Sequence, residues 1–422
     1  MYSKSRKLRS RFTFSALIFI IVTVSAWGGN GNKAAAASAS AQPDPYRIVA
    51  LGDSLTAGYE HGFTVNSVPY GYVEQVYEQA LFHGLRAEYA NYGIIGLKTE
   101  GLKLLLQAAS DGRTVKPDEI QEQLQDPRKD TLVGQTAQMA KSIRSADLIV
   151  LTIGGNDLIP VMSKLLDGAT NEEIATYIQA VLNQYEKDLE TTIRTIASLN
   201  PKAQLVMADQ YSPLPLPVLK DGAAQLRSKL DQVSSRLGTD GIKLQIADVN
   251  SLFTGHEVEY TSIAQGDIHP NRLGYAAMGQ AFAKTIWGDY RTVRPRSAGS
   301  QMSVVVDGKE LAASAAPPVL RSNRSFVAMR DIIDALGTGA KLSWSNASQS
   351  ATITYNGHKV VFTINSAYVV IDNNKVKLST PPAFLLKTGK ESKTYLPLAA
   401  LSEALGLQVT YRSTLQTAFI NK

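Results

Sequence analysis

The chain has 422 residues, 44% of them hydrophobic, and a formal net charge of +6. This length exceeds one ordinary compact domain, so two folded units are expected. The whole positive charge lies in residues 1–41, which contain six Lys or Arg and no acid; the rest of the chain is neutral, and nothing indicates nucleic acid as a partner. The absence of cysteine excludes disulfides and a lipoprotein anchor.

The first 41 residues have the order of a secretory signal peptide. Basic residues in 1–11 are followed by an apolar stretch at 12–27, and an A-x-A pattern ends at Ala41. We therefore predict a signal peptide over residues 1–41 and a mature chain that begins near Gln42. An uncleaved membrane anchor is the alternative. The apolar stretch is short for a membrane span, so no transmembrane span is expected in the mature chain.

Five apolar, β-rich segments alternate with helical patterns between residues 42 and 288, the expected first domain. The strands are expected at residues 47–51, 87–92, 148–153, 204–208 and 243–247. Helices are expected where apolar residues recur at spacings of three and four, at residues 71–83, 97–109, 134–144, 172–198, 220–237 and 272–287. This alternation predicts an α/β fold in which a parallel five-stranded sheet lies between two helical layers. In such sheets, ligands bind beyond the carboxyl ends of the strands.

The pattern changes after residue 288. Residues 289–301 are rich in Pro, Gly, Ser and charge without periodicity, which predicts a linker. Within residues 302–422, SFVAMRDIIDALG at 325–337 aligns with TYLPLAALSEALG at 394–406. Two copies of one β-helix-β unit predict a second, smaller α+β domain. This part of the chain is basic, whereas the preceding domain is acidic.

Polar or glycine-rich stretches follow four of the strands: GDSL at 52–55, NYGIIG at 91–96, GGND at 154–157 and DIHPN at 267–271. Because the carboxyl ends of parallel strands meet at one edge of the sheet, these stretches are expected to surround one pocket. A hydroxyl nucleophile needs a base, an acceptor that orients the base, and donors for the developing oxyanion. The four stretches supply these groups as Ser54, His269, Asp267, the Gly96 N–H and the Asn156 side-chain amide.

With these stretches the chain resembles the GDSL or SGNH hydrolases, whose motif blocks are centred on a serine, a glycine, an asparagine and a histidine. The resemblance covers about residues 46–288, with the blocks in the family's order. It implies a three-layer α/β/α, flavodoxin-like fold. It also implies that Ser54 attacks an ester carbonyl, that His269 takes and returns the proton, and that Asp267 orients His269. The resemblance further assigns the oxyanion hole to the N–H groups of Ser54 and Gly96 and the amide of Asn156.

Two of these assignments have alternatives. The acid usually stands three residues before the histidine, where this chain has Gly266, whereas Asp267 stands two residues before His269. If Asp267 points away from the ring, a backbone carbonyl would orient His269 instead. In the second block, Gly93 is the alternative donor, although the N-x-G-x-x-G spacing favours Gly96.

The sequence does not predict a metal site or a cofactor site. The remaining histidines belong to no convergent pattern and are predicted to be surface or packing residues: His61, His83, His256 and His358. With scattered histidines and no cysteine, no metal site is predicted. The first strand is not followed by G-x-G-x-x-G, and the chain has no G-K-[ST], so no nucleotide or other cofactor is predicted.

Three further segments bear on the substrate. The proline-rich YSPLPLPVL at 211–219 follows the fourth strand and is either an apolar lip for an acyl chain or a stiff connection without a ligand role. The connections at 59–70 and 110–131 are candidate lids on the basis of length alone.

Residues 302–422 resemble the copper amine oxidase N-terminal-like, or stalk, domain of surface proteins from Bacillus relatives. The resemblance rests on VVVDGKEL, on the F-V-x-M-R and Y-L-P-L helix starts and on two ALG helix ends, with Ala328 where proline is usual. Copper is not expected, because His358 is the only histidine in this segment. The basic charge favours binding to an anionic cell-wall polymer such as teichoic acid; a spacer or stabilising domain is the alternative.

The sequence therefore predicts a secreted, extracellular or cell-wall-associated serine ester hydrolase of the Gram-positive type. Its candidate substrates are lipid acyl esters, short-chain esters and acetylated glycans. An O-acetyl esterase or acyltransferase on envelope polysaccharide stays open, because the acyl-enzyme is shared by these reactions. The alternative from another class is a non-catalytic surface binding protein, which would be expected to have lost Ser54 or His269.

Overall fold

The fold was obtained as a computed structural model, which describes residues 44–422 except 215, 297–299, 313–315 and 389. The predicted signal peptide at residues 1–41 lies outside the described residues. Within the described ranges, no helix is both long enough and apolar enough to cross a membrane.

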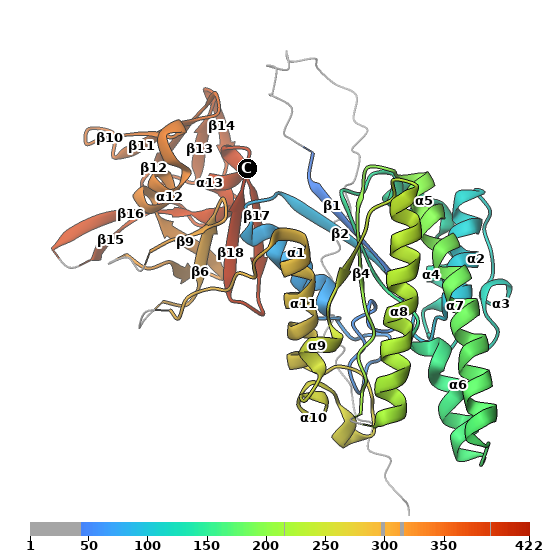
Figure 1. Cartoon of the computed structure of the whole chain (residues 1–422). Helices are drawn as coiled ribbons and strands as arrows, with labels where there is room; N and C mark the ends of the chain where they lie inside the picture. The colour runs from blue at the N-terminus through green and yellow to red at the C-terminus, as the bar shows by residue number, and fades with distance from the viewer. Residues whose placement is uncertain (1–43, 215, 297–299, 313–315, 389) are drawn as a thin grey trace, which may run out of the picture. The chain divides into compact units, whose positions relative to one another are not determined.

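A five-stranded parallel sheet forms the centre of the first domain (Figure 1). Its strands are β1 (Tyr46–Gly52), β2 (Ala87–Gly93), β3 (Leu148–Thr152), β4 (Gln204–Ala208) and β5 (Leu244–Ala247), in the order β2-β1-β3-β4-β5. Gly52 at the end of β1 is in register with Gly93 of β2 and Thr152 of β3, so the carboxyl ends of these strands are level. The predicted flavodoxin-like α/β fold is confirmed.

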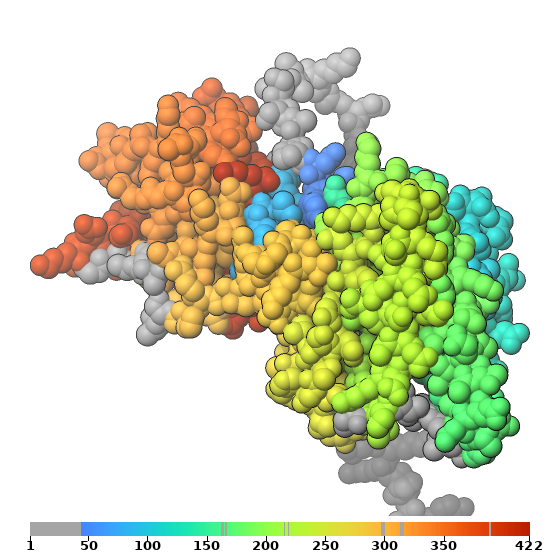
Figure 2. All heavy atoms as spheres, in the orientation of Figure 1, coloured from blue at the N-terminus to red at the C-terminus, as the bar shows by residue number. Residues whose placement is uncertain are grey.

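Two helical layers cover the sheet because β1 alternates its apolar side chains between the two faces. Ile48 and Ala50 belong to the core beneath α1 and α11, whereas Val49 and Leu51 belong to the core beneath the other layer. The first layer contains α1 (Tyr72–Phe82) and α11 (Arg272–Trp287); the second contains α2 (Thr99–Ser110), α5 (Thr136–Arg144), α7 (Asn171–Leu199) and α8 (Pro217–Thr239). In the space-filling view, α8 and α11 form much of the near surface of this domain (Figure 2).

Several short elements lie in the connections, where the sequence patterns predict none. They are α3 (Pro117–Ile120), α4 (Lys129–Gly134), α6 (Gly155–Leu166), α9 (Asn250–Phe253), α10 (Glu257–Tyr260) and one 3-10 turn at Ile263–Gln265. The longest of them, α6, starts directly after β3 and contains Pro160. Glycine and proline normally indicate breaks, which is why a helix was not expected here.

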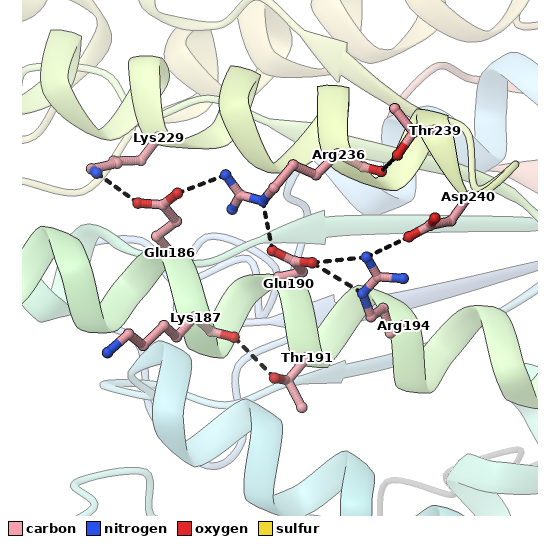
Figure 3. Close-up of polar contacts among 9 residues, drawn as sticks. All are labelled: Glu186, Lys187, Glu190, Thr191, Arg194, Lys229, Arg236, Thr239 and Asp240. Carbon is pink, nitrogen blue, oxygen red and sulfur yellow. Dashed lines mark hydrogen bonds and ion pairs between the residues drawn. The ribbon is translucent and has the colours of Figure 1, made fainter.

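Ion pairs join α7 to α8 on the outside of the second layer (Figure 3). Arg236 of α8 bridges Glu186 and Glu190 of α7, with N–O distances of 2.8 and 2.9 Å. Arg194 then links Glu190 to Asp240 beyond the end of α8. Because these side chains are partly exposed to water, the ion pairs contribute little, and the apolar core supplies most of the stability of this helix pair.

The carboxy-terminal residues form a second, smaller domain built from sheets and two helices. Its elements are β6 (Ser303–Val306), β7 (Lys309–Glu310), β8 (Val319–Arg321), β9 (Arg324–Ala328), α12 (Met329–Leu336), a 3-10 turn (Gly337–Gly339), β10 (Lys341–Ser345), β11 (Ser350–Tyr355), β12 (His358–Thr363), β13 (Tyr368–Ile371), β14 (Asn374–Lys377), β15 (Phe384–Thr388), β16 (Glu391–Pro397), α13 (Leu398–Ala404), β17 (Gln408–Arg412) and β18 (Thr417–Asn421). The aligned repeats correspond to β9–α12–β10–β11 and β16–α13–β17–β18, and β9 pairs with β16.

Residues 289–296, which follow α11, have no regular secondary structure but are hydrogen bonded to α1. The Arg291 N–H donates to Gln79 Oε1 at 2.8 Å, and its guanidinium donates to the carbonyl of Phe82 at 3.0 Å. The last strands also contact this region, since Arg412 of β17 forms a 2.7 Å ion pair with the buried Glu78. Part of the predicted linker at 289–301 is therefore held by side-chain contacts.

Candidate active site

The serine of the first block stands in a turn that requires glycine before it. Gly52 ends β1 with φ of 141°, and a Cβ at this position would collide with the carbonyl oxygen of Thr152 on β3. The next residue, Asp53, donates its N–H to the same carbonyl at 3.1 Å. These contacts direct the chain out of the sheet and place Ser54 at the carboxyl end of β1, with 5% of its surface exposed.

Asp53 is buried beneath the serine and organises the turn. Its Oδ1 accepts hydrogen bonds from the Leu55 N–H at 3.1 Å and the Thr152 hydroxyl at 2.8 Å. Burial raises the pKa of Asp53 to about 7, although these hydrogen bonds act in the opposite direction. Thr152 also bonds to Thr56 at 2.6 Å, which in turn bonds to Tyr72 at 2.9 Å. The buried side chains of Asp53, Thr152, Thr56 and Tyr72 therefore form a connected polar network beneath the serine turn.

Ser54, His269 and Asp267 form one hydrogen-bonded chain. Ser54 Oγ lies 2.8 Å from His269 Nε2, and His269 Nδ1 lies 2.6 Å from Asp267 Oδ1. The histidine is held by its own loop, because the His269 carbonyl accepts from the Ser262 N–H at 2.9 Å and Asn271 caps the start of α11. The three residues expected to provide the nucleophile, the base and the acid therefore lie together.

The short spacing between Asp267 and His269 corresponds to a local turn. Asp267 Oδ1 accepts not only from the ring but also from the His269 backbone N–H at 3.0 Å, which is the i to i+2 contact of an Asx-turn. Burial disfavours the charged carboxylate, but the hydrogen bonds and charge of His269, with a hydrogen bond from His61, hold the pKa of Asp267 below its usual value. A backbone carbonyl is not needed to orient the histidine.

Three groups are candidate donors to an oxyanion. Among the described residues, neither the Ser54 N–H nor the Gly96 N–H has a hydrogen-bond acceptor. The Asn156 amide lies in the first turn of α6 and uses one N–H on the Leu97 carbonyl at 2.9 Å, which leaves its second N–H for a ligand. Gly93 is unsuitable, because its N–H donates to the Asn91 side chain at 2.9 Å.

The turn that carries Gly96 is held by residues that the motifs do not reveal. The buried Asp126 accepts the Ile95 N–H at 2.8 Å, and Gln121 donates to the Gly96 carbonyl at 2.8 Å. Arg128 donates to both oxygens of Asp126 and keeps the pKa of that carboxyl low despite its burial. The 110–131 connection, a candidate lid in the sequence analysis, therefore supports the turn at Ile95 and Gly96 through hydrogen bonds.

Sequence reasoning also missed two residues of the 59–70 connection. Tyr59 places its ring 4.4 Å from the ring of His269, measured between centroids. His61, predicted to be a surface or packing residue, is half exposed, and its Nδ1 lies 3.4 Å from Asp267 Oδ2. The only available signal was their position: both directly follow the serine block and Gly58.

The other histidines have partners away from the serine. His83 pairs with Asp289 at 2.7 Å, His256 with Glu259 at 2.8 Å and His358 with Asp372 at 2.8 Å. Across the described ranges, His, Asp and Glu side chains form no cluster that could hold a metal ion.

An apolar pocket of about 190 Å³ opens beside Ser54. Its buried end is formed by Ala223 and Leu226 of α8, which are 4% and 2% exposed. Leu214 and Leu219 of the predicted lip line its wall, and the more exposed Ile268 and Ile159 also line it. The pocket therefore offers apolar surface next to the Ser54 hydroxyl and few polar groups beyond it.

Residues 50–277 match the model of the GDSL-like lipase/acylhydrolase family, which is more than half of the chain. The chain belongs to this family. The predicted class, a serine hydrolase that cleaves ester bonds, is thereby confirmed. Residues 305–420 match the model described as copper amine oxidase N-terminal domain, in agreement with the second resemblance.

Three proteins to which this GDSL-like chain is similar share 24% identity or less with it. The uncharacterized protein YpmR of Bacillus subtilis (strain 168) is 24% identical over 181 residues, which cover 40% of this chain and 62% of that protein, less than two thirds of its length. The lipase Lip_vut3 from a goat rumen metagenome shares 20% identity at a TM-score of 0.42, covering 58% of this chain and 100% of that one. Axe2, an acetylxylan esterase from Geobacillus stearothermophilus, shares 17% sequence identity at a TM-score of 0.39, and the match covers 59% of this chain and 97% of that one.

Proposed function

We propose that this protein hydrolyses carboxylic esters through an acyl-enzyme on Ser54. The observation that carries the proposal is the hydrogen-bonded chain from Ser54 through His269 to Asp267 at the mouth of an apolar pocket. A serine hydroxyl in contact with an imidazole that is itself held by a carboxylate is the arrangement needed for nucleophilic attack at neutral pH.

In the first half-reaction, Ser54 Oγ attacks the ester carbonyl while His269 Nε2 accepts the hydroxyl proton. The negative carbonyl oxygen of the tetrahedral intermediate is stabilised by the N–H groups of Ser54 and Gly96 and the amide of Asn156. Collapse of the intermediate breaks the bond to the alcohol oxygen, which leaves with the proton held by His269. The Ser54 ester, the acyl-enzyme, remains.

In the second half-reaction, water replaces the alcohol. His269 takes a proton from the water molecule while the water oxygen attacks the acyl carbonyl carbon. It returns that proton to Ser54 Oγ when the bond between Oγ and the acyl carbon breaks. The acid product then dissociates. Throughout the cycle the negative charge of Asp267 stabilises the imidazolium form of His269 and keeps its Nδ1 protonated.

The pocket supports esters with an apolar acyl chain as substrates. A chain on the carbonyl carbon would extend past Leu214 and Leu219 toward Ala223 and Leu226, where it would be removed from water. An acetyl group would leave this pocket empty. We therefore favour acyl esters longer than acetyl over acetylated glycans as the substrate class.

A series of p-nitrophenyl esters of increasing chain length tests both parts of this proposal. Ser54→Ala should abolish turnover, with the exposed Ser145→Ala as the matched control, and kcat/KM should rise from acetate to medium-length chains. Ala223→Leu, which shortens the buried end of the pocket, should move the preference toward shorter chains without loss on acetate. Undiminished turnover by Ser54→Ala would refute the mechanism, and a series that is best on acetate would refute the acyl assignment.

We also propose that the protein is exported and that residues 302–422 hold it at an anionic cell-wall polymer. The proposal is supported by the signal-peptide pattern at 1–41 and by the basic charge of the second domain, including the exposed Lys375 and Lys377 on β14. The mature protein should sediment with purified walls at low salt and be released at high salt. Lys375→Glu/Lys377→Glu should weaken sedimentation while esterase activity in solution is retained; salt-independent sedimentation would argue against a polyanion as the ligand.

A further inference from the structure

The segment that follows the serine turn reaches back to the acid–base pair. Tyr59 donates its N–H to the Ser54 carbonyl at 3.0 Å, and its own carbonyl accepts from the buried Tyr275 hydroxyl at 2.6 Å. Its ring lies against His269. This anchored residue carries the chain to His61, two positions further, which faces Asp267. The position of His61 is thus fixed by the same turn that positions the serine.

The two oxygens of Asp267 have different partners. Oδ1 accepts both the ring Nδ1 and the backbone N–H of His269. Oδ2 points the other way and lies 3.4 Å from Nδ1 of His61. The side chain of Asp267 is 13% exposed and that of His61 is 52% exposed, so the carboxylate is mostly shielded from water whereas the histidine reaches solvent. Two histidines therefore share one carboxylate.

We propose that His61 is a positioning residue of the catalytic pair: its Nδ1–H holds Oδ2 of Asp267 and limits how strongly this carboxylate attracts the proton of His269. The proposal rests on the proposed function, because it assumes that His269 is the base. A hydrogen bond or positive charge on Oδ2 offsets part of the negative charge that stabilises protonated His269. The imidazolium form of His269 is then stabilised less, which favours the form that accepts the Ser54 proton.

Other ionisable groups near the pair do not replace His61. The Tyr59 hydroxyl also faces Asp267, and burial, the Asp267 charge and a hydrogen bond to it raise its pKa, so it stays neutral. Tyr211 and Asp53 are groups of the protein interior near the pair. Burial, followed by the charges of Asp53 and Asp267, raises the pKa of Tyr211 well above its usual value, so its hydroxyl stays neutral.

On the solvent side, Glu60 is next to His61 in the chain. Burial raises the pKa of its carboxyl, and the charge of Arg272 on α11 opposes that rise. Of these groups, only His61 places a ring N–H donor at Oδ2 of Asp267 from the solvent side.

The test is the pH dependence of kcat/KM with a short-chain p-nitrophenyl ester, whose acidic limb reports the base of the free enzyme. His61→Ala should move this limb to higher pH. His61→Lys, which keeps a positive charge near Oδ2 at all pH values of the assay, should move it to lower pH. Because His61 is half exposed, each shift is expected to be roughly 0.2–0.7 of a pH unit and to shrink at high salt.

His256 provides a matched control. It is 52% exposed, like His61, and pairs with Glu259 at 2.8 Å, but it contacts none of the three site residues. His256→Ala should leave the pH profile unchanged. Superimposable profiles for wild type, His61→Ala and His61→Lys, or shifts of both variants in one direction, would overturn the proposal. Full activity of Ser54→Ala would instead refute the proposed function, so the two failures are distinguishable.

Discussion

Replacement of Asp267 by asparagine tests how the acid of the site works. Asp267 Oδ1 accepts from both the ring and the backbone N–H of His269, at 2.6 and 3.0 Å. In Asp267→Asn the amide oxygen is expected to take this place, because an NH2 group there would face the backbone N–H. The Nδ1–H tautomer of His269 is then retained, and Nε2 can still accept from Ser54. The variant loses only the negative charge.

The expected loss follows from that charge. A hydrogen bond to a charged group contributes about 1.5–3 kcal/mol and a neutral one about 1 kcal/mol, so the difference of about 0.5–2 kcal/mol predicts a roughly 2- to 30-fold fall in kcat. Asp267→Ala removes the acceptor as well. Loss of tautomer control in a chymotrypsin-type triad costs about 10⁴-fold, and we expect about 10³- to 10⁴-fold here.

The assay is kcat of wild type, Asp267→Asn and Asp267→Ala on one p-nitrophenyl ester, with circular dichroism to confirm that each variant is folded. The two expected losses differ by about two to three orders of magnitude. If Asp267→Asn is as impaired as Asp267→Ala, the amide has turned and the Asx-turn does not control the tautomer. If both variants stay within about tenfold of wild type, another group orients His269.

Three further substitutions have expected outcomes. Asp126→Ala should lower kcat about tenfold with little change in KM, because the turn that presents the Gly96 N–H loses its support; steady-state kinetics checks this. Burial raises the pKa of Asp53 to about 7, so the folded chain keeps a proton that the unfolded chain releases near pH 4. The contribution of Asp53 to the free energy of unfolding should therefore fall as the pH rises from about 4 to 7. Urea titrations of Asp53→Asn at several pH values should lack this contribution. Lys103→Met leaves the carboxylate of Asp188, 5% exposed, without its 2.7 Å partner and should cost about 3 kcal/mol in urea unfolding, most of it recovered when Asp188→Leu is added. A Lys103→Met protein as stable as wild type would contradict this account.

Regular elements with a strong hydrophobic period were predictable from the sequence. The strand at 204–208 and the helix at 272–287 match their predicted bounds. The strand is a continuous apolar run buried on both faces of the sheet, and the helix buries one apolar face. The α6 helix was not predictable, since its Gly154-Gly155 start and Pro160 indicate a break, whereas its placement depends on packing against α7. Tertiary contact overrode local preference in this case.

The residues of the candidate site likewise include some that the sequence predicts and some that it does not. Ser54, Asn156 and His269 follow sheet strands or precede a helix, so the topology alone predicts that they meet. Asp126 and His61 lie in irregular connections, and whether such a side chain reaches the site depends on the path of the loop, which no periodicity encodes.

The spacing of Asp267 and His269 shows why a departure from the family pattern need not disturb the chemistry. An aspartate two residues before the histidine can accept the histidine's own backbone N–H, a bond that defines an Asx-turn. That bond holds the carboxylate on the side where the ring nitrogen lies, so the ring contact follows from local geometry. Gly266, with φ of 79°, supplies the reversal just before the aspartate, and the Tyr211 hydroxyl holds the intervening Ile268 carbonyl at 2.8 Å. Since Oδ1 satisfies both His269 donors, Oδ2 is left to face outward. With the shorter spacing, Oδ2 is therefore the oxygen that contacts His61.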